Sequence, residues 1–347
     1  MPGFLPAMPW PPAATVVVFA LAGLITVAGS IRLVGLGDVL ADRTGWGEAL
    51  FGVVFFGVAT GLSGIVMTAV AAASEQPQLG YSNAVGGIAA QTTAVALADA
   101  FYRRVNLEHA AASLSNLLSG CLLIALLALA LLGTFSPNVT VAGLHPVSVA
   151  ILACYVGGLR LVRTAGAAPL WEAVTTSETR PDVPEKHGPL DLHSPRWLWS
   201  RFAAIGVLVA VGGWAIALAA ENLVEITGLA AGFVGGVLMG LVNALPEAVT
   251  AIAAVRRGAL TLAVAAVLGG NILDALTLVV GDLAYPGGSI YHAVGDRELF
   301  VTTTGLLMTA TLLGGLLVRQ AGGWGRLGFE GIVLVGTYLL MVVVVAT

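Results

Sequence analysis

Long apolar runs separated by short polar connections dominate the chain. Each run is about as long as the roughly 20 residues that a helix needs to cross the hydrocarbon core of a bilayer. The runs lack the two-residue alternation of membrane β-strands and are about twice as long as such strands. The pattern predicts about ten transmembrane helices, at residues 13–34, 48–73, 78–100, 109–133, 143–163, 202–220, 228–254, 259–283, 299–318 and 329–346.

The composition agrees with a chain that is mostly surrounded by lipid. Of its 347 residues 58% are hydrophobic and only 10% are charged, whereas soluble domains carry about 25% charged residues. We therefore expect an all-α polytopic membrane protein whose partners are the lipid bilayer and inorganic ions. No basic patch with interleaved aromatic residues occurs in the sequence, so the sequence predicts no nucleic-acid partner.

Basic residues gather on alternate connections between the predicted spans. If the N-terminus lies outside, 14 of the 15 basic residues lie on the cytoplasmic side, and Arg297 is the exception. The positive-inside rule then places both termini on the non-cytoplasmic side. The first apolar run is too long for a signal peptide and has no basic residues before it, so we expect it to be retained. The lack of targeting segments favours a prokaryotic-type plasma (inner) membrane.

The chain divides into two similar halves. A polar stretch at 164–200 separates five spans in 1–163 from five spans in 201–347, and we expect it to lie along the cytoplasmic surface. A shift of 183 residues aligns 45–99 with 228–282 without a gap, and the identical pairs include Gly86/Gly269, Gly87/Gly270 and Asp99/Asp282. An odd number of spans in each half inverts the second copy. Inverted repeats are typical of transporters, with the substrate site near the midplane of the membrane.

The second repeat carries the candidate chemistry. Glu247 and Asp274 lie inside apolar spans, where a carboxylate costs several kcal/mol unless it is paired or hydrated. Asn243 and Asn271 lie on the same two spans, and Pro246 is expected to break its helix and free a backbone carbonyl. Carboxylate, amide and carbonyl oxygens together suit a hard cation. The alternative is a pair of neutral, hydrogen-bonded carboxyls that only fix helix contacts.

Other polar residues have simpler explanations. Asp99 and Asp282 end their spans, where interfacial solvation or ion pairing accounts for them. The five histidines do not cluster, and Cys121 and Cys154 read as free thiols in apolar runs. No serine–histidine, cysteine–histidine or metalloprotease spacing occurs at membrane depth, so an enzyme is not expected, and no cofactor is predicted.

The segments of the second repeat resemble the α-repeats of the calcium/cation antiporter superfamily, the sodium/calcium exchangers. The signature is roughly Gly-Thr-Ser-x-Pro-Glu, followed later by Gly-Ser-Asn-x-x-Asn or Asp. The resemblance implies ten helices in two inverted halves and a secondary active cation antiporter that works by alternating access. It also implies that Glu247 and Asp274 are cation ligands and that Asn243 stands at the position of the signature threonine.

The first repeat departs from this signature. It reads Thr60-Gly61-Leu62-Ser63-Gly64 and then Gly86-Gly87-Ile88-Ala-Ala-Gln91, so glycine stands at the acidic position and glutamine at the second asparagine. Thr60, Ser63, Gln91 and Thr92 offer oxygens without charge, and the site carries at most −2. A third sodium ion would leave net positive charge in a low-dielectric interior.

Two functions follow from this asymmetry. The first is an antiporter that exchanges a cation such as calcium for sodium or protons, with an altered stoichiometry or ion choice. The second is a non-transporting membrane scaffold or sensor that retains the exchanger fold with a degenerate ion site. The sequence predicts neither the transported ion nor the oligomeric state.

Overall fold

The computed structural model describes residues 10–44, 57–102, 105–167, 169, 171–174, 176, 192–323 and 328–347. Nine helices in this part are long and apolar enough to cross a membrane. A tenth apolar helix, α3 (Gly57–Ala73), is shorter, and the rest of the predicted span 48–73 lies outside the described residues. The prediction of about ten membrane helices in an all-helical fold is confirmed.

The helices follow the predicted spans closely, and most ends agree within a few residues. The elements of the first part are α1 (Pro12–Thr44), α3, α4 (Pro77–Phe101), α5 (Leu107–Ala111), α6 (Leu114–Phe135) and α7 (Pro146–Ala167). Those of the second part are α8 (Pro195–Thr227), α9 (Ala231–Phe233), η3 (Val234–Met239), α10 (Gly240–Arg257), α11 (Leu260–Ala284), η4 (Ile290–His292), α12 (Asp296–Val318) and α13 (Phe329–Ala346). The largest differences are in α1 and α8, which each have 33 residues.

The connection between α7 and α8 is shorter than the polar segment 164–200, because both helices extend into that segment. Helix α7 runs into it as far as Ala167, and α8 begins within it at Pro195. Ser194 caps α8 because its side chain accepts a hydrogen bond from the backbone N–H of Trp197. The division into 1–163, 164–200 and 201–347 remains a prediction.

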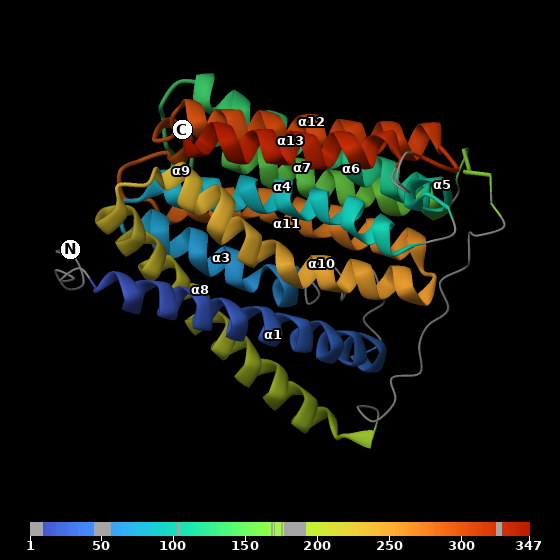
Figure 1. Ribbon diagram of the computed structural model, residues 1–347, viewed down its shortest axis with the longest axis horizontal. Helices are drawn as coiled ribbons and strands as arrows, with labels where there is room; N and C mark the ends of the chain where they lie inside the picture. The colour runs from blue at the N-terminus through green and yellow to red at the C-terminus, as the bar shows by residue number, and fades with distance from the viewer. Residues whose placement is uncertain are drawn as a thin grey trace.

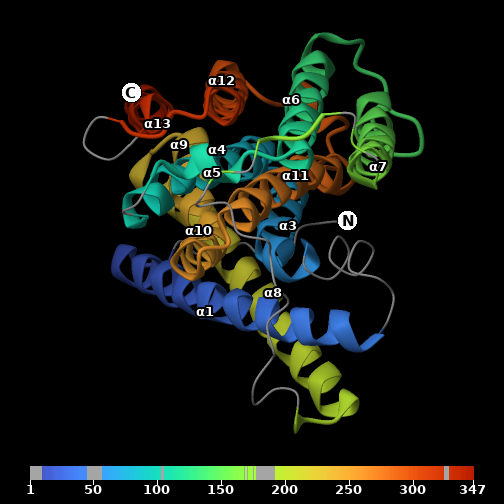
Figure 2. The same cartoon turned by 90° about the vertical axis from the view of Figure 1, so that its right-hand side faces the viewer.

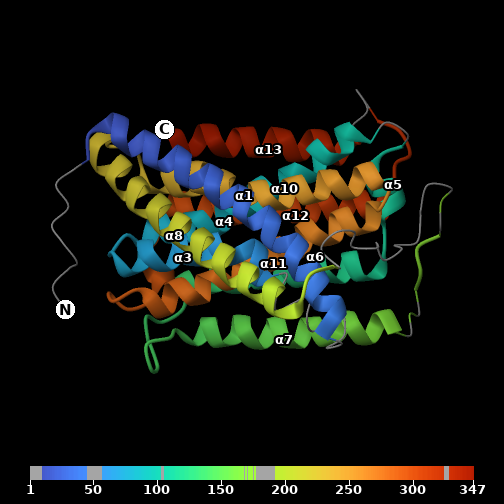
Figure 3. The ribbon, with the colours of Figure 1, turned by 90° about the horizontal axis from the view of Figure 1, so that it is seen from below.

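The 183-residue offset found in the sequence also relates the helix starts. Pro195 lies 183 residues after Pro12, and Leu260 lies 183 residues after Pro77. The same offset relates the start of α13 to that of α7. Helices α1 and α8 run in opposite directions, and α1 starts at the end of the bundle where α13 finishes (Figures 1 and 3). These features are those of inverted repeats.

Reciprocal contacts show that the two repeats are related by an approximate two-fold axis. A Cβ atom added to Gly29 on α1 would lie 2.6 Å from Cγ2 of Val209 on α8. In return, a Cβ atom on Gly212 would contact the hydroxyl of Thr26. Val209 and Gly212 are the equivalents of Thr26 and Gly29 at the 183-residue offset, so each contact has its counterpart, as in an isologous interface. Small residues permit this close crossing in a membrane.

Asp99 and Asp282 are a second equivalent pair, and the predicted interfacial solvation is wrong for both. Both side chains are buried. Asp99 Oδ1 accepts a hydrogen bond from the backbone N–H of Leu107 (2.6 Å), and Asp282 Oδ1 accepts one from that of Ile290 (3.1 Å). Each carboxyl therefore holds the segment eight residues after it, at the start of α5 or η4. Such buried backbone donors require a partner.

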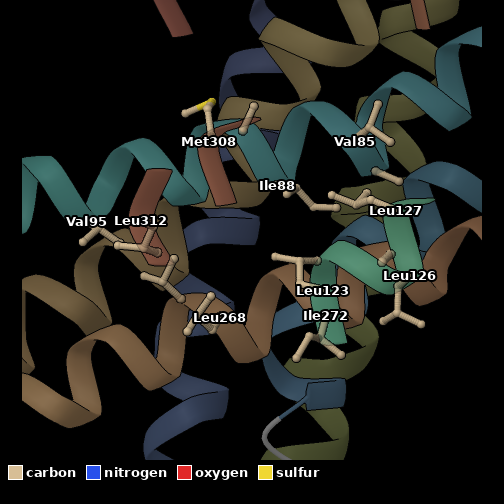
Figure 4. Packing of buried hydrophobic residues seen from close by; sticks show 14 of the residues in the cluster. Val85, Ile88, Val95, Leu123, Leu126, Leu127, Leu268, Ile272, Met308 and Leu312 are labelled. Atoms are coloured by element: carbon tan, nitrogen blue, oxygen red, sulfur yellow. The ribbon is translucent and has the colours of Figure 1, made fainter. Parts of the chain in front are cut away.

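The helices form three layers (Figure 2). α1 and α8 lie on one side, α6, α7, α12 and α13 lie on the other, and α3, α4, α10 and α11 lie between them. Apolar side chains of α4, α6, α11 and α12 meet between the middle layer and the outer one, among them Ile88, Leu127, Ile272 and Met308 (Figure 4). The spans of α4 and α11 are the most buried, and that of α7 is the least. Polar residues at the centre of α4 and α11 are thus shielded from lipid.

The glycine crossing of α1 and α8 leads to a first prediction. Gly29→Leu should lower the melting temperature of the detergent-purified protein, because overpacking typically costs about 1–3 kcal/mol. Gly35→Leu, on the same helix, is the control, since no described atom lies within 4 Å of a Cβ at Gly35. Equal melting temperatures for the two variants would contradict the close crossing.

Glu108 on α5 leads to a second prediction. Its burial, followed by the nearby carboxyls of Glu330 and Asp99, raises the pKa of Glu108 well above its ordinary value of 4.5. The folded protein therefore binds a proton more tightly than the unfolded chain, and stability falls as the pH rises from 4.5 through the folded pKa. Glu108→Gln should raise the melting temperature at pH 8 more than at pH 5. Glu225→Gln, at an exposed position, should change neither value.

Candidate functional site

The helix that carries Asn243 and Glu247 begins irregularly. Residues Val234–Met239 form a π-helical segment, η3, before the regular helix α10. Isolated π-helical turns are often found at functional sites. Helix α10 then continues through Pro246 to Arg257, so the predicted break at the proline is wrong. The irregular turn lies on its N-terminal side instead.

Glycines bring α4 directly onto η3 and α10. A Cβ atom added to Gly86 would overlap the backbone of Gly236, and one added to Gly240 would lie 2.8 Å from the carbonyl carbon of Gly86. The two backbones therefore touch where they cross. Only a residue without a Cβ, which is glycine, permits this approach. The approach brings the polar residues of α4 within reach of α10 and α11.

The carboxylate of Asp274 lies at the centre of the site, on α11, and is only 2% exposed. Its Oδ1 accepts a hydrogen bond from Nδ2 of Asn243 on α10 (2.9 Å), and its Oδ2 accepts one from Nε2 of Gln91 on α4 (2.7 Å). Gln91 and Asp274 are equivalent at the 183-residue offset, so the second bond joins the two repeats near their axis. Both donors offset the cost of burying the carboxylate.

Glu247 lies one turn after Asn243 on α10 and is also buried. A Cβ atom on Gly270 would lie 3.0 Å from Cγ of Glu247 and 2.6 Å from Oε1 of Gln91. Both side chains therefore extend over the bare backbone at Gly270. Helix α11 stays regular through this glycine, so the role of Gly270 is to allow close approach of the two side chains.

Asn271 and Thr92 connect α11 to α4 beside this group. Nδ2 of Asn271 donates a hydrogen bond to Oγ1 of Thr92 (2.8 Å), and that hydroxyl donates to the carbonyl of Ile88 (2.7 Å). The structure thus brings five predicted residues together, namely Gln91, Asn243, Glu247, Asn271 and Asp274. Thr60 lies on α3, and its side chain is outside the described part.

Several buried oxygens of this group have no hydrogen-bond partner among the described residues. They are Oε1 of Gln91, Oδ1 of Asn243 and Oδ1 of Asn271. Buried polar atoms without partners are uncommon and call for an explanation. A hard cation binds to such oxygens and would satisfy them.

Asn83 belongs to the same region, and the sequence interpretation missed it. Its Nδ2 donates to the carbonyl of Gly64 (3.3 Å) and to Oγ1 of Thr68 (3.0 Å), which ties α4 to α3. Its repeat equivalent is Ala266, so the internal alignment gave no signal at this position. An amide within an apolar span, near its start, was the available signal.

Within the described residues, no group of three or more His, Cys, Asp or Glu side chains is placed to hold a metal ion. The candidate site has two carboxylates, from Asp274 and Glu247, and its other described polar groups are the amides of Gln91, Asn243 and Asn271 and the hydroxyl of Thr92. This composition fits a hard cation such as calcium or sodium better than a transition metal.

A curated relative shares part of the sequence. The sodium/calcium exchanger MaX1 of Methanosarcina acetivorans is 31% identical over 121 residues, which are 35% of this chain and 32% of that protein. The match therefore spans about a third of the length of the relative.

Solved structures share the fold over nearly the whole chain. The H+/Ca2+ exchanger CAX superposes with a TM-score of 0.69 at 13% identity and covers 96% of this chain and 85% of its own. Native YfkE gives 0.65 at 18% identity, with 98% and 94% covered. The sodium-calcium exchanger NCX_Mj gives 0.58 at 17% identity, with 95% and 97% covered. At these identities the likeness shows the fold.

The family comparison extends over both halves of the chain. Residues 14–176 and 197–347 match the family described as sodium/calcium exchanger protein, so the match includes the candidate residues of both repeats. The chain therefore belongs to the sodium/calcium exchanger protein family, a family of membrane transporters rather than enzymes.

Proposed function

We propose that the chain is a secondary active cation antiporter, with Asp274 and Glu247 as the charged ligands of the transported cation. The buried Asp274 carboxylate, held by one amide from each repeat, is the observation that carries the proposal. Buried acids in membrane helices mark ion pathways. The unpaired oxygens beside Asp274 and the family of the chain support the same function.

The amides of Gln91 and Asn243 have a double role in this proposal. Each donates a hydrogen bond to Asp274 through its nitrogen and keeps an oxygen without a described partner. One amide can therefore hold the carboxylate and coordinate a cation at the same time. Asn271 and the hydroxyls of Ser63 and Thr60 complete the proposed ligand set.

Transport follows from the inverted repeats. In alternating access, the two repeats exchange conformations and open the same central site to one side of the membrane and then to the other. Sodium ions or protons compete with the cation for the two carboxylates. The proteins that the chain is similar to include both a sodium/calcium and an H+/Ca2+ exchanger, so both sodium and protons are candidate counter-ions.

The proposed arrangement in the membrane completes this function. Both termini lie on the non-cytoplasmic side of a prokaryotic-type inner membrane, and the stretch 164–200 lies on the cytoplasmic side between the two halves. The distribution of basic residues supports this orientation.

A non-transporting scaffold or sensor is the second candidate. The observation that favours it is the neutral first repeat, in which Gly64 and Gln91 occupy the positions equivalent to Glu247 and Asp274. Binding of calcium to the purified protein separates the candidates, because a scaffold with a degenerate site binds none.

The role of Glu247 is tested by flux. Glu247→Gln keeps the size of the side chain and removes its charge, so calcium uptake into liposomes driven by a sodium or pH gradient should be abolished. The melting temperature should stay close to that of the wild type. Glu225→Gln is the matched control at an exposed position. Undiminished uptake by Glu247→Gln would refute the proposed ligand.

The charge of the site limits the stoichiometry. With both carboxylates ionised the site carries −2, which neutralises one divalent cation or two monovalent cations. A third sodium ion would be a net positive charge in a low-dielectric interior. Exchange of two monovalent ions for each calcium moves no net charge, so we expect calcium uptake into liposomes to stay the same when an imposed membrane potential is varied, whereas three-to-one exchange would depend on that potential. A ratio of three sodium ions to one calcium would contradict this count.

A further inference from the structure

The side-chain amide of Asn243 is enclosed on three sides. Its Nδ2 donates to Asp274, and Asn243 is only 1% exposed. A Cβ atom on Gly64 would lie 2.5 Å from its Oδ1 and 3.0 Å from its Nδ2. A Cβ atom on Gly87 would lie 2.8 Å from its Nδ2. The amide therefore lies between two bare glycine backbones and a carboxylate.

The glycine at position 64 is explained by the lack of space for a side chain there, and not by its backbone conformation. The residue lies inside the regular helix α3 and is not among the glycines with a positive φ. Any side chain at position 64 would enter the volume of the Asn243 amide. Movement of the amide away from position 64 brings it toward the backbone at Gly87 or breaks its hydrogen bond to Asp274.

The internal repeat identifies what is missing at position 64. The equivalent of Gly64 in the second repeat is Glu247, and the equivalent of Asn243 in the first repeat is Thr60. Two identical repeats would have the same residue at positions 64 and 247 and the same residue at positions 60 and 243, and one such combination is glutamate at 64 with threonine at 243. Here, a larger neutral side chain on α10 accompanies the loss of a charged side chain on α3.

We propose that Gly64 and Asn243 form a matched pair that sets the ion capacity of the site. The amide of Asn243 fills the volume that a side chain at position 64 would need, and it replaces a negative charge with a neutral donor to Asp274. The pair thereby keeps the site at −2 and excludes one monovalent cation. The part of this inference that concerns ion capacity rests on the proposed function. The part that concerns the steric coupling of Gly64 and Asn243 does not.

The steric coupling is tested by thermal stability in detergent. Gly64→Ala should lower the melting temperature of the wild type by several degrees, because its Cβ displaces the amide from Asp274. In the Asn243→Thr background the same substitution should cause a much smaller loss, since the shorter side chain leaves room. Gly61→Ala on α3, with no described atom within 4 Å of its Cβ, is the control. Equal losses in both backgrounds would overturn the pairing.

The capacity is tested by equilibrium binding with the double variant Gly64→Glu/Asn243→Thr. Its third carboxylate should raise the Hill slope for sodium displacement of bound calcium from about two in the wild type to about three. If the double variant melts near the wild-type temperature and its Hill slope is unchanged, the proposed ion capacity is overturned.

The two measurements separate this inference from the proposed function. A wild-type protein that binds no calcium would refute the proposed function and the capacity, whereas the stability comparison would still decide the pairing. If the double variant does not fold, the site does not accept a third carboxylate and the proposed capacity is refuted, while the stability comparison with Gly64→Ala still decides the steric pairing. A smaller loss of melting temperature in the Asn243→Thr background would support the steric pairing. A Hill slope of about three in the double variant would support the ion capacity.

Discussion

The rest of the structure depends on one buried carboxylate, that of Asp274, and on the two amides that donate to it. A charged group at membrane depth is stable only with close polar partners. These partners come from α4 and α10, one from each repeat. The helix backbones must therefore approach closely, and Gly86, Gly236 and Gly240 make that approach possible. The glycines at the helix crossings and the hydrogen bonds of Asp274 therefore depend on each other in this protein.

The scaffold around the carboxylate is nearly symmetric. The reciprocal contacts at the α1–α8 crossing and the matching hydrogen bonds of Asp99 and Asp282 have counterparts in both repeats. These contacts are structural, and both repeats need them for the same reason: close helix crossing and satisfied backbone donors. An inverted pair with equal packing has two conformations of similar energy, which is the physical basis of alternating access.

The site is asymmetric although its frame is symmetric. The second repeat supplies both carboxylates, while the first repeat supplies an amide at Gln91 and bare backbone at Gly64. The neutral side chains still take part, since Gln91 holds Asp274 and Asn83 ties α4 to α3. The neutral first repeat therefore leaves the hydrogen-bonded geometry around Asp274 in place, and under the proposed function it changes only how many ions the site neutralises.

Local patterns in the sequence determined the number of helices, their approximate ends and the two candidate acids, because hydrophobicity, length and composition act within one span. Comparison of the two halves of the sequence determined the 183-residue repeat. Only the tertiary structure decided which groups hold Asp274, because its partners lie 31 and 183 residues away and meet only through packing. It also decided that α10 passes through Pro246 unbroken, that Asp99 and Asp282 are buried anchors, and that Gly64 borders Asn243. Each of these depends on what a neighbouring helix places beside the residue.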